Sequence, residues 1–356
     1  MKISVIVSTH NRSNMLKDSI QSLIHQTLNP SQYEIIVGDS YSDDSGIENR
    51  ELINSMIDEY PQHNISYFYE KIKGGYSLTR NEAVKKAASD LIVFGDDDFI
   101  ASDTYLEACI DGLLSDNKVG LVTGPLIPIF ESDPPNWVLK LQKKNSFSKY
   151  YTDFTIIEFD RDVDNLPYNF IWASSFGCKK SVFIECGGFP PDGFSGDLTL
   201  YTTRGESALA ERAQKKGYSI RACVKMKAHH HVKSYRFSKE YFFSRYYIYG
   251  VNASVNKLTK TNLSFYSKPF FFGFFLAKYL KTVLMFALPK RYRFKRVMML
   301  GYISGFVNHH ILVKKSNFMK KYIMQTDWMN FDFKQIVPIR TTSKVTIGKI
   351  FSYLFL

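Results

Sequence analysis

The stretch Leu91 to Phe99, with the sequence LIVFGDDDF, decides how the rest of the chain is interpreted. Its first four residues are apolar, and such a run predicts a buried strand. Three carboxylates follow a glycine, and adjacent acids repel one another unless a cation lies among them. A divalent metal, held by carboxylate oxygens and by the phosphates of a substrate, would supply that cation. An acidic turn in solvent is the alternative. We favour the metal because a core strand precedes the acids.

Three further strands precede this one, and a helix follows each of them. Apolar runs predict the strands at 3–8, 33–38 and 65–69, and helical spacing predicts the helices at 13–28, 47–59 and 78–88. This alternation predicts a parallel α/β sheet with helices on its faces, whose ligands bind beyond the carboxyl ends of the strands. Two of those ends carry acids (Asp39 and Asp96 to Asp98), and a third carries Thr9 to Arg12. We therefore expect one polar crevice at this edge of the sheet.

The pattern weakens further along the chain. Residues 119–129 predict one strand interrupted by Gly and Pro, and 138–170 show no regular pattern. A helix is predicted from Glu206 to Lys216 and a strand from Tyr218 to Cys223. No GxGxxG follows the first strand and no P-loop lysine motif is present, so neither nucleotide-binding fingerprint is supported.

Charge divides the 356 residues into two parts. The net charge is +12, but from Cys223 onward there are 24 Lys and Arg against three Asp and Glu. The preceding part is mildly acidic. Basic tails bind phosphate-rich surfaces, either anionic membrane or nucleic acid. The four cysteines show no paired spacing, which favours reduced, buried thiols.

The most apolar stretch of the tail is 269–288. Its apolar residues favour membrane insertion by about 4–7 kcal/mol, and its two lysines oppose insertion by about the same amount. A spanning helix is therefore not the better interpretation. An interfacial helix beside the polybasic run 290–296 predicts binding to an anionic bilayer, which fits the apolar stretch better than nucleic acid does. Burial of the helix against the rest of the protein is the alternative. Gly301 and Gly305 form a weak GxxxG signal.

Taken together, several motifs resemble the family 2 glycosyltransferases with the GT-A fold. They are VIVSTHNR (Val5 to Arg12), EIIVGDSYSDD (Glu34 to Asp44), GGYSLTRNEAVKKAASDLIVFGDDD (Gly74 to Asp98), GGF (Gly187 to Phe189), RGESALAERAQKKGY (Arg204 to Tyr218) and HHV…R (His230 to Arg236). The resemblance implies a GT-A catalytic domain over 1–235, with a nucleotide-sugar half (1–100) and an acceptor half (101–235). A basic, mainly helical extension over 236–356 would follow.

The resemblance also implies a set of donor-binding residues. They are Thr9, Asn11, Arg12, Asp39, Ser40, Arg80, Asp96, Asp97 and Arg236. Ser40 stands where the family often has an acid that reads uracil, so the choice of nucleotide base is open. Arg80 matches an arginine near the diphosphate, and a solvated helix residue is an equal alternative.

Asp96 to Asp98 match the DxD element of the family. Asp98 and His231 are the implied ligands of Mn²⁺ or Mg²⁺, which would offset the charge that grows on the leaving diphosphate. His229 and His230 are left open, and a surface cluster of histidines is the alternative interpretation.

Glu206 is the implied catalytic base. It precedes Arg212 and the pair Gly217-Tyr218, as the family motif requires, although Gly205 and Ser207 stand beside it where an acid is usual. A glutamate that faces the helix macrodipole is the structural alternative. Asp197 is the fallback base.

These observations predict an inverting, metal-dependent glycosyltransferase of surface-polysaccharide assembly. It would move a sugar from a nucleotide-diphosphate donor (UDP-sugar favoured) to a glycan or lipid-linked acceptor. We expect it to be cytoplasmic, peripherally bound to the inner membrane, and not a nucleic-acid binder. A catalytically inactive nucleotide-sugar-binding protein and a membrane polysaccharide synthase are the alternatives.

Overall fold

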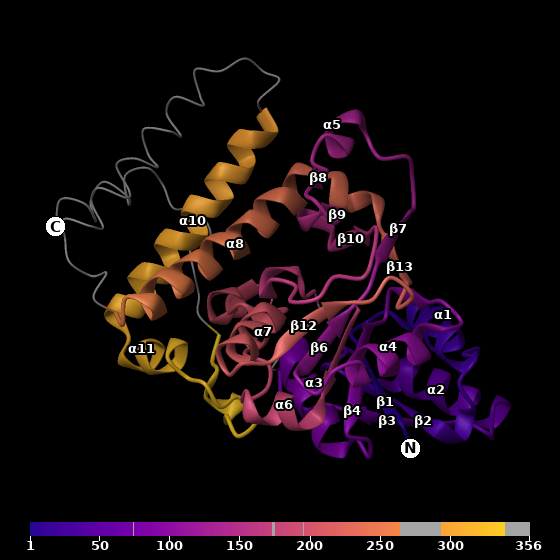
Figure 1. Ribbon diagram of the computed structural model, residues 1–356. Helices are drawn as coiled ribbons and strands as arrows, with labels where there is room; N and C mark the ends of the chain where they lie inside the picture. Colours follow the sequence, from indigo (N-terminus) through magenta and orange to yellow (C-terminus); the bar gives the residue numbers. More distant parts are fainter. Residues whose placement is uncertain (74, 173–174, 195, 264–292, 339–356) are drawn as a thin grey trace, which may run out of the picture. The chain divides into compact units, whose positions relative to one another are not determined.

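The computed structural model describes residues 1–73, 75–172, 175–194, 196–263 and 293–338, drawn in colour in Figure 1. The chain forms two compact units. The first comprises Met1–Gly193, Arg204–Ser234 and Thr326–Gln335, and the second comprises Phe194–Thr203, Tyr235–Gln325 and Ile336–Leu356. The boundary expected from the sequence lies between residues 235 and 236. It would place residues 194–203 in the first part and 326–335 in the second, which is the reverse of their units in the structure. We call Thr326–Gln335 the return segment, because the chain comes back to the first unit there.

A seven-stranded sheet forms the centre of the first unit, in the order β12-β6-β11-β4-β1-β2-β3. The strands are β1 (Ile3–Thr9), β2 (Tyr33–Asp39), β3 (Asn64–Tyr69), β4 (Leu91–Asp96), β6 (Val119–Thr123), β11 (Phe176–Lys179) and β12 (Ser219–Ala222). Neighbouring strands run parallel except around β11, which is antiparallel to both β4 and β6. The predicted α/β fold with a mostly parallel sheet is confirmed.

The helices of the first unit connect these strands. They are α1 (Ser13–Ile24), α2 (Ile47–Glu59), α3 (Gly75–Lys86), α4 (Tyr105–Leu114), α5 (Asn136–Leu139), α6 (Lys180–Glu185) and α7 (Gly205–Lys215). In α1, Leu16, Ile20 and Leu23 recur at helical spacing and are fully buried, as the sequence pattern predicts. All seven residues of β1, Ile3–Thr9, are buried without alternation, which is typical of a strand covered on both faces.

A second, six-stranded sheet belongs to the same unit, in the order β5-β13-β7-β10-β9-β8. Its strands are β5 (Phe99–Ala101), β7 (Leu126–Phe130), β8 (Lys143–Lys144), β9 (Ser148–Tyr151), β10 (Ile156–Phe159) and β13 (Ala228–Val232). The single strand expected over 119–129 is two strands, because Gly124 and Pro125 separate β6 from β7. Three short strands also lie within 138–170, which the sequence pattern left unassigned.

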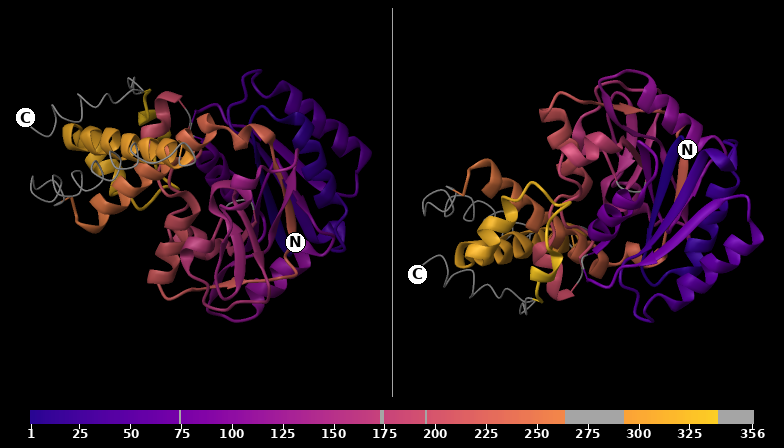
Figure 2. Two further views of the ribbon diagram at one scale, coloured as in Figure 1. Left: turned by 90° about the horizontal axis from the view of Figure 1, so that it is seen from above. Right: turned by 90° about the horizontal axis from the view of Figure 1, so that it is seen from below.

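The second unit is built on two long helices, α8 (Lys239–Lys260) and α10 (Arg293–Lys315), followed by α11 (Asn317–Ile323). Figures 1 and 2 show α8 and α10 side by side. Gly301 and Gly305 lie directly against the backbone of Phe243 and Tyr247 on α8, so the GxxxG sequence packs helix on helix within this chain. The stretch 269–288 lies outside the described residues. None of the helices described is both long and apolar enough to cross a membrane.

Candidate active site

The acids that follow β4 meet the loop that leaves β1. Asp97 and Asp98 are buried, at 1% and 4% exposed. Arg12 Nη1 lies 3.0 Å from Asp97 Oδ1 and 3.3 Å from Asp98 Oδ2. Thr9 Oγ1 donates to Asp97 Oδ2 at 2.9 Å. The structure therefore brings the predicted residues Thr9, Arg12, Asp97 and Asp98 together, because β1 pairs with β4 in parallel register.

Burial dominates the electrostatics of Asp97. It raises the pKa of this carboxyl to about 7, the charge of Arg12 acts in the opposite direction, and the neighbouring charges of Asp98 and Asp96 raise it further. Burial likewise raises the pKa of Tyr76, and the charges of Asp97, Asp96 and Asp98 act in the same direction. This end of the sheet thus holds carboxylates that favour any cation able to enter.

The histidine ring that faces Asp98 is that of His230. Its Nε2 lies 3.4 Å from Asp98 Oδ1, and the side chain is 3% exposed. His231 contacts Asp98 only through its backbone, donating from its amide to the Asp98 carbonyl at 3.0 Å. Because side chains alternate along β13, His229 and His231 share the opposite face from His230. The predicted role of His231 as a metal ligand stays a prediction.

The residues at Asp98 fit a divalent metal. A carboxylate and an imidazole at one place suit Mn²⁺, and a carboxylate alone suits Mg²⁺. In the part of the chain that the structure describes, no group of three or more His, Cys, Asp or Glu side chains could by itself hold a metal ion. An ion at Asp98 would therefore take its remaining ligands from substrate phosphates and water.

Arg80 joins the acids of β4 to the predicted base. Its Nη1 donates to Glu206 Oε1 at 2.9 Å, and its Nη2 donates to Asp96 Oδ1. Its Nε donates to Ser8 Oγ at 3.1 Å. The Arg80 side chain is 5% exposed, so the alternative of a solvated helix residue is wrong. Its predicted contact with a donor diphosphate stays untested.

Glu206 lies in the first turn of α7, with its side chain 15% exposed. Burial raises the pKa of Glu206 above its usual value, while the charge of Arg80 acts in the opposite direction. A glycine precedes it for a steric reason. Gly205 has φ +44°, and a Cβ there would lie 2.5 Å from Asp192 Oδ2. The carboxylate of Asp192 thus occupies the space beside the start of α7.

The loop after β2 is built on Asp39. Its carboxylate is fully buried and accepts from Ser42 N (2.9 Å), Asn49 Nδ2 (2.7 Å) and Tyr67 Oη (3.1 Å). Asn11 ties the first loop to this one, because its side chain both donates to and accepts from Asp43. These contacts show Asp39 organising a loop. Its predicted role in nucleotide binding, and that of Asn11 and the buried Ser40, are not tested by them.

Two predicted residues belong to the second unit. Arg236 lies in η5 (Ser234–Phe237), and the exposed Asp197 lies in η4 (Gly196–Tyr201). Sequence reasoning did not single out Ser8 or Asp192, and it left the role of His230 open. Strand alternation would have separated His230 from its neighbours, but no sequence signal links Asp192 to α7.

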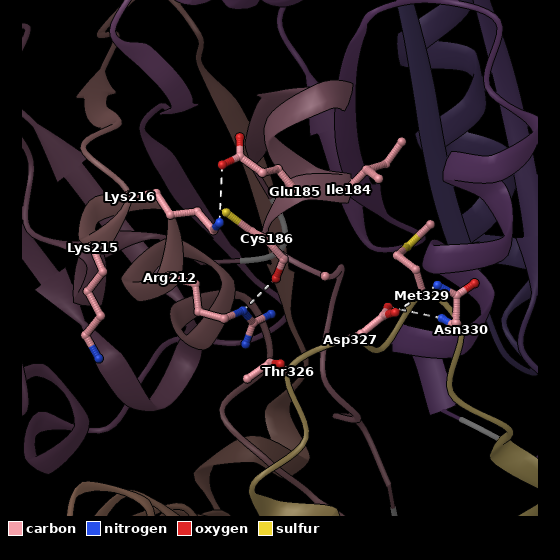
Figure 3. A pocket seen from close by; sticks show the side chains of 11 residues that line it. Ile184, Glu185, Cys186, Arg212, Lys215, Lys216, Thr326, Asp327, Met329 and Asn330 are labelled. Atoms are coloured by element: carbon pink, nitrogen blue, oxygen red, sulfur yellow. Dashed lines mark hydrogen bonds and ion pairs between the residues drawn. The ribbon is translucent and has the colours of Figure 1, made fainter.

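A pocket of about 620 Å³ lies elsewhere in the first unit (Figure 3). Its lining comes from the end of α6, the last turns of α7 and the return segment. Arg212 is held there by the carbonyls of Cys186 and Gly188, and Lys216 pairs with Glu185 at 3.2 Å. None of the acids described above lines this pocket.

The chain is similar to several known proteins. Residues 4–185 match the model of "Glycosyl transferase family 2". A poly(ribitol-phosphate) beta-glucosyltransferase of Bacillus spizizenii is 32% identical over 108 residues, which are 30% of this chain and 16% of that protein. An O-antigen chain rhamnosyltransferase of Salmonella typhimurium is 27% identical over 234 residues, covering 65% of this chain and 66% of that protein. The chain thus spans about a sixth of the length of the first of these relatives.

Among solved structures, a mannosyltransferase from Pyrobaculum calidifontis in complex with GDP-Man and Mn²⁺ superposes with a TM-score of 0.54. The match covers 88% of both chains at 15% sequence identity. At this identity the likeness establishes the fold.

Proposed function

Because the chain belongs to glycosyl transferase family 2, we propose that it transfers a sugar from a nucleotide-diphosphate donor to a glycan or lipid-linked acceptor. One observation carries the proposal. Arg80 joins Glu206, a half-buried acid at the start of α7, to Asp96 at the end of β4. In this proposal, a base for the acceptor and a carboxylate cluster for the donor share one site.

The proposed reaction is a direct displacement with inversion. The acceptor oxygen forms a bond to the anomeric carbon while the bond from that carbon to the diphosphate oxygen breaks. Glu206 takes the acceptor proton, and the raised pKa that burial gives it makes it a better base near neutral pH. Thr9, Arg12 and Asp97 bind and orient the donor. Asp98, with His230 beside it, would hold Mn²⁺ or Mg²⁺, which when bound neutralises charge on the leaving diphosphate.

A donor panel tests the proposal. Nucleoside diphosphate release would be measured from UDP-glucose, UDP-N-acetylglucosamine, GDP-mannose and dTDP-rhamnose, with poly(ribitol phosphate) or a lipid-linked oligosaccharide as acceptor. We expect turnover with Mn²⁺, its loss with EDTA, and an inverted anomeric configuration by NMR. If no donor reacts in the presence of metal, the chain is instead a nucleotide-sugar-binding protein.

The setting we propose is surface-polysaccharide or teichoic acid assembly at the cytoplasmic face of the membrane. Relatives named for O-antigen and poly(ribitol-phosphate) synthesis support this setting. The excess of Lys and Arg after Cys223 supports peripheral binding to anionic lipid.

A further inference from the structure

Arg80 occupies an unusual position for a residue that binds a mobile ligand. Its three side-chain nitrogens, Nε, Nη1 and Nη2, already donate to Ser8, Glu206 and Asp96 respectively. The guanidinium also lies 5.8 Å from the ring centre of Tyr76 and 5.9 Å from that of Phe189. The side chain is therefore held by five other side chains of the protein itself.

The charges around Arg80 have a matching arrangement. Asp96 and Glu206 contact it directly, and the charge of Asp192 also acts on it. A buried guanidinium can bridge two carboxylates at once because its donors form a rigid fork. A lysine ammonium is a single point charge and cannot hold both acids in the same geometry.

From these contacts we propose that Arg80 is a positioning residue for Glu206, the proposed base. Arg80 holds the Glu206 carboxylate beside Asp96, so that the base for the acceptor lies next to the acids that bind the donor. The inference rests on the proposed glycosyl transfer and assigns Arg80 a task other than binding the diphosphate. A contact of the neighbouring residue also fixes the helix that carries Arg80. The side chain of Asn81, the next residue on α3, accepts from Phe189 N at 2.9 Å and donates to Phe189 O at 3.0 Å.

Kinetics separate the two tasks. In Arg80→Lys and Arg80→Gln we expect kcat to fall about 100-fold while the donor KM stays within about threefold, because a misplaced base slows the chemical step without weakening donor binding. If Arg80 instead bound the diphosphate of the donor, replacing it would raise the donor KM, and that result would overturn the inference. Lys85→Gln, an exposed substitution on the same helix, is the matched control.

The pH profile provides a second readout. The ion pair favours the ionised form of Glu206, so Arg80→Gln should move the acid limb of kcat/KM to higher pH. Arg80→Lys keeps a positive charge and should leave that limb near its wild-type position despite its low kcat. An acid limb that is identical in all three proteins would contradict the assignment.

A measurement without substrate keeps this inference separate from the proposed function. Melting temperatures would be compared for wild type, Arg80→Gln, Glu206→Gln and the double variant, after circular dichroism has confirmed their folding. We expect the loss in the double variant to be clearly smaller than the sum of the two single losses. Additive losses would overturn the pairing. If the wild-type protein were inactive with every donor, only the proposed function would be overturned, and the pairing of Arg80 with Glu206 would stand.

Discussion

At the scale of single residues, the site depends on a few buried charges. Burial and neighbouring acids raise the pKa of Asp97, and burial raises that of Glu206, so both carboxylates are held ready to bind or to accept a proton. Sequence motifs located these residues, since each follows an apolar strand or begins a helix. The motifs did not locate Asp192, because contacts across loops carry no local sequence pattern. Ser8 lies within one of the motifs, but nothing near it in the sequence signals its contact with Arg80.

Replacing the base tests its chemistry directly. Glu206→Gln keeps the shape of the side chain but removes the proton acceptor, so we expect kcat to fall at least about 100-fold with little change in donor KM. Steady-state assays with the active donor measure this. Glu82→Gln, a half-buried surface acid on α3, serves as the control. Unchanged kcat in Glu206→Gln would point to Asp197 instead.

Metal binding depends on Asp98. Asp98→Asn removes the charged ligand, and we expect the affinity for Mn²⁺ in the presence of UDP to fall about tenfold or more. Electron paramagnetic resonance of free Mn²⁺ measures the change without turnover. The exposed Asp90→Asn should bind Mn²⁺ as wild type does. Equal affinity in the two variants would remove Asp98 from the metal site.

At the scale of elements, the return segment completes the first unit. Trp328 is 2% exposed, and its amide donates to the carbonyl of Gly187 at 2.8 Å. Asn81 Nδ2 donates to the Trp328 carbonyl at 3.4 Å. The sequence did not predict this docking, because the segment lies beyond a basic helical region and shows no periodic pattern. Elements with a strong local pattern, such as the helical spacing of α1 and the apolar run of β4, were predicted correctly.

Removing the Trp328 side chain should destabilise the first unit. We expect Trp328→Ala to lower the free energy of unfolding by about 3–5 kcal/mol, the usual loss for a large buried aromatic side chain. Denaturant titration followed by circular dichroism measures it. Lys334→Ala changes an exposed residue of the same segment and should have almost no effect. Similar losses in both variants would contradict the docking described here.

Two buried histidines make the second unit sensitive to acid. Burial lowers the pKa of His309 to about 3 and that of His310 to about 4. Their contribution to stability is therefore present above the unfolded-state pKa of about 6.5 and is lost as the pH falls below it. For His309 alone the loss at pH 5 is about 2 kcal/mol.

The substitution His309→Gln tests this dependence. The variant should show a smaller drop in melting temperature between pH 7.5 and pH 5 than wild type, because one fewer buried group has to accept a proton. Scanning calorimetry at both pH values measures the difference. His25→Gln, at an exposed position, should keep the wild-type drop. A full-sized drop in His309→Gln would assign the acid sensitivity to other groups.

At the scale of the whole molecule, charge predicts where the protein acts. The 24 Lys and Arg after Cys223 should bind the full chain to vesicles containing phosphatidylglycerol at low salt. Binding should weaken strongly at 0.5 M NaCl because salt screens exposed charges. Co-sedimentation measures the bound fraction, with phosphatidylcholine vesicles as the control. Equal binding to both lipids would exclude an electrostatic cause.

The fold and most of the first-unit site could be predicted because strand ends and motifs are local features. The second sheet could not be predicted, since β8, β9 and β10 are two to four residues long and too short for a periodic signal. The two compact units also differ from the division expected from the sequence. Charge marks the basic tail as one block, whereas contacts assign its last described helical turn, η8 (Phe333–Gln335), to the first unit.

The return segment has a consequence for biosynthesis. Asn81 and Trp328 are separated by 247 positions, so the first unit closes only after residue 328 has left the ribosome. A nascent chain that ends before residue 326 lacks the contacts that hold the turn at Gly187, and through it Phe189 and the neighbourhood of Arg80. Such long-range closure slows folding. The first unit would therefore close only after the basic helices that precede the return segment have been translated.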